Sequence, residues 1–141
     1  MQANDLAEIL AIEQASSQSP WSSVQLQQSI EHTQVLVVDS QLAGFLVIGT
    51  VLDYAEVYNL AIHPRKQGLG LGAVLLEHGI DSLPPEVRVL HLEVRVSNFR
   101  AIRLYQQRGF IEVGERRDYY RTQYGRENAL LMSRVLGTDL D

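Results

Sequence analysis

The N-terminal part of the chain has apolar positions at helical spacing. Within residues 5–16 they recur every three or four residues, which predicts an amphipathic helix. These apolar residues are Leu6, Ile9, Leu10 and Ile12. A loop and a second short helix follow, for which we expect Ser22 as the N-cap because a serine side chain accepts a hydrogen bond from the first turn.

The spacing then changes to that of β-strands. The runs VLVV and LAGFLVIGTVL flank Asp39 and Ser40, and this pattern predicts a hairpin with its turn at these two residues. The run AEVYNLAI, residues 55–62, predicts a third strand, which Pro64 is expected to end.

Helix and strand patterns alternate after this point. Residues 72–83 carry apolar side chains at i, i+4 and i+7 and predict a helix that Pro84 terminates. Residues 88–96 alternate strictly between apolar and polar. This predicts a strand with Leu90, Leu92 and Val94 on one face and His91, Glu93 and Arg95 on the other.

One more helix and a strand pair complete the pattern. Residues 97–110 predict a helix with Ser97 as N-cap and Gly109 as the first residue beyond its end. Residues 110–120 and 127–136 predict two closing strands. The expected order is α-α-β-β-β-α-β-α-β-β, in a single domain over residues 1–141.

Composition narrows the class of protein. Apolar residues make up 45% and charged residues 21%, which is ordinary for a globular domain. We find neither a membrane-spanning apolar run nor a signal peptide, so we expect a cytoplasmic monomer without a membrane partner. The net charge of −5 argues against nucleic-acid binding. The absence of cysteine excludes a cysteine nucleophile.

The stretch HPRKQGLGLG, residues 63–72, lies between a predicted strand and a predicted helix. Glycines let backbone N–H groups approach a phosphate closely, and a helix N-terminus adds partial positive charge. Arg65 and Lys66 add full charges. The spacing matches neither the P-loop nor the dinucleotide-binding fingerprint. By itself it leaves two interpretations open, a phosphate cradle or a glycine-rich turn with solvated cations.

Within this stretch, RKQGLG resembles the Arg/Gln-x-x-Gly-x-Gly/Ala motif of the GNAT N-acetyltransferases, which binds the pyrophosphate of acetyl-CoA. Further segments, in the same order, are similar to the RimI-type enzymes of this superfamily, which acetylate the N-terminal alanine of a small-subunit ribosomal protein. These segments are NLAIHP, LEVRVSN, AIRLYQQRGF, RRDYY and GRENALLM. The resemblance spans roughly residues 5–135. It implies an α/β GNAT fold, with a mixed, mostly antiparallel sheet of about six strands, splayed at its centre and flanked by helices.

The resemblance implies acetyl-CoA as cosubstrate and assigns residues to it. They are Leu60, Ala61, Ile62, Arg65, Lys66, Gln67, Gly68, Leu69, Gly70, Leu71, Gly72 and Asn98. The backbone of the strand before the loop would pair with the pantetheine arm, and Asn98 would hydrogen-bond the cofactor. Asn98 has an alternative role as a helix cap. Gly68 follows Pro64 by only four residues, about two fewer than in RimI-type chains, which predicts a tighter loop.

The same resemblance assigns the catalytic roles. Glu93 would be the base, because a partly buried carboxylate on its strand face can accept a proton near neutral pH. Tyr105 would be the acid that protonates the leaving thiolate. The alternatives are an exposed polar residue for Glu93 and a packing aromatic for Tyr105. Without a cysteine, we expect direct transfer in a ternary complex.

Four residues match stretches that shape the peptide site in RimI-type enzymes. They are Glu13, Trp21, Tyr119 and Tyr120. Ordinary core or strand positions are the alternative for the aromatic residues. A single base suits an α-amino group, whose pKa is about 8, better than a lysine side chain, whose pKa is about 10.4.

Other functions stay open on sequence alone. One is a GNAT enzyme that acts on a small amine or on lysine side chains, and another is a non-catalytic acyl-CoA-binding or interaction domain. No metal is expected, because the histidines lack metal-ligand spacing. They are His32, His63, His78 and His91.

Overall fold

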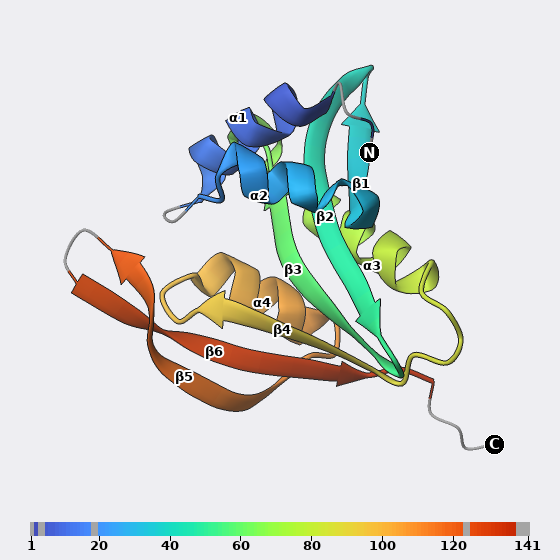
Figure 1. The fold of residues 1–141 in the computed structure, drawn as a ribbon, viewed down its shortest axis with the longest axis vertical. Coiled ribbons are helices and arrows are strands. Elements are labelled where there is room, and N and C mark those ends of the chain that lie inside the picture. The colour runs from blue at the N-terminus through green and yellow to red at the C-terminus, as the bar shows by residue number, and fades with distance from the viewer. Residues whose placement is uncertain (1, 3–4, 18–19, 123–124, 138–141) are drawn as a thin grey trace. The chain divides into compact units, whose positions relative to one another are not determined.

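The structure is a computed structural model, and it describes residues 2, 5–17, 20–122 and 125–137. The elements follow the predicted order (Figure 1). The helices are α1 Leu6–Ser16, α2 Ser23–Gln28, α3 Leu71–Asp81 and α4 Phe99–Gln107. The strands are β1 Thr33–Val38, β2 Gln41–Val51, β3 Tyr54–Ile62, β4 Val89–Arg95, β5 Ile111–Thr122 and β6 Gly125–Val135.

The six strands form one sheet in the order β1-β2-β3-β4-β6-β5. β1 with β2, β4 with β6, and β5 with β6 are antiparallel, whereas β3 and β4 are parallel. The mixed, mostly antiparallel sheet is therefore confirmed. The parallel ladder joins Tyr54–Val57 to Val89–Leu92, and both strands continue beyond it.

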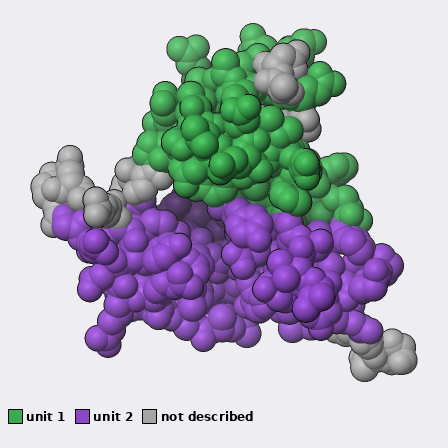
Figure 2. Space-filling view, viewed as in Figure 1, with its two compact units in different colours: residues 1–48, 59–82 green, residues 49–58, 83–141 purple. Residues whose placement is uncertain are grey.

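The chain divides into two compact units (Figure 2). Residues 1–48 and 59–82 form the first unit, and residues 49–58 and 83–141 form the second. The first has a core built from both N-terminal helices and from strands β2 and β3. Its buried members are Ile9, Ile12, Leu26, Phe45, Val47 and Ala61.

The second unit contains the strand that carries the predicted base. Alternation along β4 is confirmed for residues 90–94, because Leu90, Leu92 and Val94 are buried while His91 and Glu93 are only half-buried. Arg95, which was predicted on the polar face, departs from this pattern and is buried, since its guanidinium lies over the Tyr120 ring and pairs with Glu127. In Figure 1, β5 and β6 form the long hairpin next to β4 in this sheet. Other buried side chains of this unit are Tyr105, Phe110, Ala129 and Met132.

Local sequence signals explain the element ends. Asp39 and Ser40 both have positive φ, 52° and 63°, as a tight hairpin turn requires. Ser22 caps α2 in a capping box with Gln25. The predicted N-cap of α4 is wrong: Asn98, not Ser97, accepts the hydrogen bond from the first turn.

Ser97 does not cap the helix, because its hydroxyl donates a hydrogen bond to Glu127 at 2.6 Å. Gly109 follows α4 with φ of 88°, as predicted for the residue beyond the helix end.

Among the described residues, no helix is long and apolar enough to cross a membrane.

Candidate active site

The glycine-rich loop has the backbone that a phosphate cradle needs. Gly68 and Gly70 have φ of 82° and 79°, and a Cβ atom at either position would meet nothing within 4 Å. Both features leave the backbone open to a ligand. A side chain at either position would be strained by its φ alone.

The loop between β3 and α3 is held by its own side chains. Residues Pro64–Lys66 form one 3₁₀ turn, capped by the His63 Nδ1 atom, which accepts from the Arg65 N–H at 3.0 Å. The Gln67 side-chain amide donates to the Ile62 carbonyl at 3.0 Å. These bonds hold the loop against the end of β3.

Helix α3 begins directly after this loop and has no side-chain cap, because its N-cap residue is Gly70. The first N–H groups of a helix lack intrahelical partners and carry partial positive charge. The start of α3 and the cations Arg65 and Lys66 therefore belong to one short segment suited to an anion.

The end of β3 lies very close to β2. A Cβ atom on Gly44 would lie 2.6 Å from Ile62 Cδ1 and 2.7 Å from the Ala61 carbonyl oxygen. The neighbouring Ala43 carbonyl accepts from the His63 N–H at 2.7 Å. Because Gly44 has no side chain, β2 can come this close to Ala61 and Ile62, which belong to the segment predicted to pair with the pantetheine arm.

Helix α4 places Asn98 and Tyr105 about two turns apart. The Asn98 side-chain oxygen accepts from the Ala101 N–H at 3.2 Å. Within the described residues its amide nitrogen makes no hydrogen bond, which leaves this nitrogen as a donor. The predicted cap role of Asn98 is therefore present, and a cofactor contact remains compatible with it.

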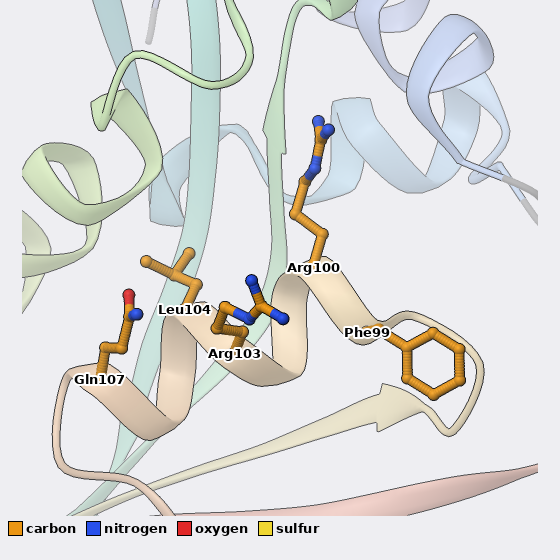
Figure 3. A pocket seen from close by; sticks show the side chains of 5 residues that line it. All are labelled: Phe99, Arg100, Arg103, Leu104 and Gln107. Atoms are coloured by element: carbon orange, nitrogen blue, oxygen red, sulfur yellow. The ribbon is translucent and has the colours of Figure 1, made fainter.

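An open hollow of about 420 Å³ lies along α4. Its lining residues are Phe99, Arg100, Arg103, Leu104 and Gln107. Figure 3 shows that both arginine side chains leave the helix on the side that carries Leu104 and Gln107. This side of α4 combines positive charge with an apolar wall.

Tyr105 is 6% exposed, and its ring packs edge-on against Phe110 with the centroids 5.5 Å apart. Burial, and next the charge of Tyr120, raises the pKa of Tyr105 above its usual value. The phenol therefore stays protonated at neutral pH. Within the described residues its hydroxyl has no hydrogen-bond partner, so it remains able to donate to a ligand.

Glu93 lies on β4, and 25% of its side-chain surface is exposed. Its Oε1 atom forms an ion pair with Arg116 Nη2 of β5 at 2.9 Å. Arg116 also covers the ring of Tyr119, with its guanidinium carbon 4.6 Å from the ring centroid. The predicted base and one predicted peptide-site tyrosine thus share one arginine.

The tyrosine pair lies at a bulge of β5. Register between β5 and β6 shifts between Arg116 and Tyr120, and Asp118 within it has φ of 52°. The rings of Tyr119 and Tyr120 meet edge-on at 5.1 Å. The bulge redirects adjacent residues, which allows both rings to gather beside the charged face of β4.

Tyr120 also contacts charged groups. The Arg95 guanidinium lies 4.7 Å from the centroid of its ring. Burial first, and then Glu93 and Tyr119, raises the pKa of Tyr120 to about 12, against the opposing effect of Arg95 and Arg116. Glu93 and Tyr119 therefore both interact electrostatically with Tyr120.

Glu127 connects Arg95 to Ser97, just before the start of α4. Its carboxylate accepts from the Ser97 hydroxyl and N–H and pairs with Arg95 at 3.5 Å. Burial alone raises the pKa of Glu127, but the Ser97 hydrogen bonds and Arg95 outweigh it, and the net pKa is lowered. The segment GRENALLM was matched to the family without a catalytic role, and Glu127 serves structure.

Glu13 and Trp21 are brought together in the first unit, but not as two surface groups. Glu13 is only 2% exposed. Its carboxylate accepts from the Trp21 backbone N–H at 2.9 Å and from the Asn59 amide at 3.1 Å. Glu13 therefore fixes the loop that leads into α2, while the Trp21 side chain is half-buried against the core.

Sequence reasoning missed Arg116 and Arg95. Arg95 ends a strand of alternating apolar and polar residues, and Arg116 lies in the charged run ERRD. Neither pattern shows which residues these side chains contact. The pairing of β6 with both β4 and β5 brings these arginines together. Among the residues that the structure describes, no group of three or more His, Asp or Glu side chains could hold a metal.

Comparison with known proteins gives the family. The chain is 39% identical over 137 residues to the [ribosomal protein bS18]-alanine N-acetyltransferase of Escherichia coli (strain K12), covering 94% of this chain and 93% of that one. The crystal structure of the Escherichia coli ribosomal-protein-S18-alanine N-acetyltransferase matches with a TM-score of 0.90 at 38% identity, over 99% of this chain and 92% of the other.

A more distant solved structure, Arabidopsis thaliana NAA60 in complex with acetyl-CoA, shares the fold. Its TM-score is 0.86 at 18% identity, over 98% of this chain and 97% of that one. The sequence model of the Acetyltransferase (GNAT) family matches residues 4–110. The chain is an acyltransferase and belongs to the Acetyltransferase (GNAT) family.

Proposed function

We propose that this protein transfers the acetyl group of acetyl-CoA to the N-terminal alanine of ribosomal protein bS18. The observation that carries the proposal is the 39% identity to an enzyme of this name over 94% of the chain. The group on β4 and β5 supports it, because an accessible carboxylate lies beside two tyrosines. We further propose a cytoplasmic monomer without a nucleic-acid, membrane or metal partner.

Several features fit acetyl-CoA. The open glycine backbone and the uncapped start of α3 suit its pyrophosphate, with Arg65 and Lys66 as neutralising cations. Leu69, Leu71 and Gly72 belong to the same segment. In this proposal the backbone of Leu60–Ile62 pairs with the pantetheine arm, and the Asn98 amide hydrogen-bonds the cofactor.

Acetyl-CoA supplies an activated acetyl group as a thioester. Glu93 removes the proton that the α-amino group loses as it forms the amide, directly or through a water. Tyr105 donates a hydrogen bond, and then its proton, to the departing thiolate sulfur. Because burial keeps this phenol protonated, the donor is present over the whole neutral range.

The resemblance assigns peptide binding to Tyr119 and Tyr120 in the second unit, and to Glu13 and Trp21 in the first. Tyr119 is 46% exposed and can contact a peptide, whereas Glu13 acts only by fixing the loop. An N-terminal amine has a pKa of about 8, so one carboxylate base suffices to deprotonate it near neutral pH.

The test is a mass-spectrometric acetylation assay with two peptides. One copies the alanine-starting N-terminus of bS18, and the other has the same sequence with a blocked N-terminus and free lysines. We expect one acetyl group on the first peptide alone. Acetylation of the blocked peptide would indicate a lysine acetyltransferase, and no reaction with bound acetyl-CoA would point to a small amine or a binding role.

A further inference from the structure

Arg116 reaches Glu93 across an intervening strand. Glu93 on β4 pairs with Leu131 of β6, and Arg116 on β5 pairs with Ala129 of the same strand. Two strand spacings of about 4.8 Å separate β4 from β5, a span that a long arginine side chain can cover. The small side chain of Ala129 leaves the surface above β6 free for this crossing.

The ion pair does little for the stability of the fold. Arg116 is 52% exposed at its side chain, and exposed ion pairs contribute little to folding. The pair fixes the Glu93 carboxylate on one side through Oε1, while the exposed quarter of the side chain remains accessible to an amine.

Arg116 has a second contact, and this contact faces the peptide side. Its guanidinium lies on the Tyr119 ring at 4.6 Å, an arrangement that its planar group favours. Tyr119 lies within the bulge between Arg116 and Tyr120, where the strand register does not define the ring position. Arg116 is the group that holds this ring and the base in a fixed relation.

We propose that Arg116 is a positioning residue that aligns the Glu93 base with the Tyr119 wall of the peptide site. The inference rests on the proposed function, in which Glu93 removes the amine proton. Arg116 makes no covalent step and acts through Glu93 on turnover and through Tyr119 on peptide binding.

A double-mutant cycle tests the first action. In the otherwise unchanged enzyme, Arg116→Ala should lower kcat for the bS18 peptide about tenfold, because a misplaced base loses its alignment. In the Glu93→Gln enzyme, the same change should lower kcat less than about twofold, because no base remains to be aligned. The KM for acetyl-CoA should stay unchanged in both backgrounds.

Arg117 provides the matched control. It is the next residue on β5, is exposed, and Arg117→Ala removes the same charge from the same strand. This variant should keep kcat within about twofold of the unchanged enzyme. Matching melting temperatures of the Arg116 and Arg117 variants establish that both are folded.

Arg116→Lys tests charge against planar contact. It should recover most of kcat and still raise the KM for the peptide several-fold, because lysine keeps the charge and loses the flat ring contact. Equal loss of kcat from Arg116→Ala in both backgrounds would overturn the proposal and leave Glu93 as base. Full activity of Glu93→Gln alone would instead overturn the proposed base, and the role of Arg116 with it.

Discussion

Gly44→Ala tests whether the close approach of β2 and β3 matters. The added Cβ would lie 2.6 Å from Ile62 Cδ1 and 2.7 Å from the Ala61 carbonyl oxygen, where ordinary contacts begin at 3.4 Å. The Ile62 methyl can rotate away, but the carbonyl belongs to a strand and must move by about 0.7 Å. The strain therefore falls on the backbone that we assign to the pantetheine arm.

Overpacking of this kind costs about 1–3 kcal/mol of unfolding free energy. In a domain of this size, each kcal/mol lowers the melting temperature by about 3–5 °C, so we expect a loss of roughly 3–15 °C. The KM for acetyl-CoA should rise several-fold, because the displaced carbonyl lies in the strand segment assigned to the cofactor. The KM for the peptide should change little.

Thermal denaturation and steady-state kinetics measure both effects. Gly114→Ala is the control, because its added Cβ would lie 3.4 Å from Leu131 Cδ1, an ordinary contact. If Gly44→Ala had the same melting temperature as Gly114→Ala and kept its KM for acetyl-CoA, the close approach of β2 and β3 would have no role in stability or cofactor binding, and the prediction would be refuted.

Four further changes test other parts of the site. Glu93→Gln should lower kcat/KM most near pH 7 and less above pH 9, where the α-amine of pKa about 8 loses its proton unaided. A profile of kcat/KM against pH measures this effect, and a loss that does not depend on pH would contradict it. Tyr105→Phe should lower kcat about tenfold or more while acetyl-CoA binding, measured by calorimetry, stays within about twofold; a loss confined to binding would count against the acid role. Glu13→Ala should lower the unfolding free energy by about 2–5 kcal/mol in urea denaturation, because it leaves the Trp21 N–H and the Asn59 amide without their acceptor; an unchanged midpoint would contradict this. Tyr120 has its pKa raised from 10.0 to about 12, so the folded state holds this proton more tightly, and stability from this group is present below pH 10 and lost as pH rises toward 12. Tyr120→Phe should therefore flatten the fall in stability over that range, and an unaltered slope in urea midpoints would refute the assignment.

The sequence was sufficient to predict which elements form and which face of β4 carries Glu93. Apolar periodicity reports burial directly, and Leu92 and Val94 are buried where the alternation required. The spacing of the glycine loop left both a phosphate cradle and a plain turn open, and the resemblance predicted the cradle. The positive φ values of Gly68 and Gly70 are compatible with it.

Contacts between distant strands could not be predicted in this way. Arg116 meets Glu93 because β6 lies between β4 and β5, an order that local patterns do not encode. The same limit explains Ser97, which looked like a cap by position, whereas Glu127 takes its hydroxyl and Asn98 caps the helix. Glu13 was assigned to the peptide site by resemblance, and only the packing of α1 shows that its side chain is buried.

The most direct test of the proposed function is tandem mass spectrometry of intact bS18 after incubation with the enzyme and acetyl-CoA. We expect a single acetyl group, carried by every fragment that contains the N-terminal alanine and by no internal lysine fragment. An acetyl group located on lysine side chains, with the N-terminal amine left free, would contradict it.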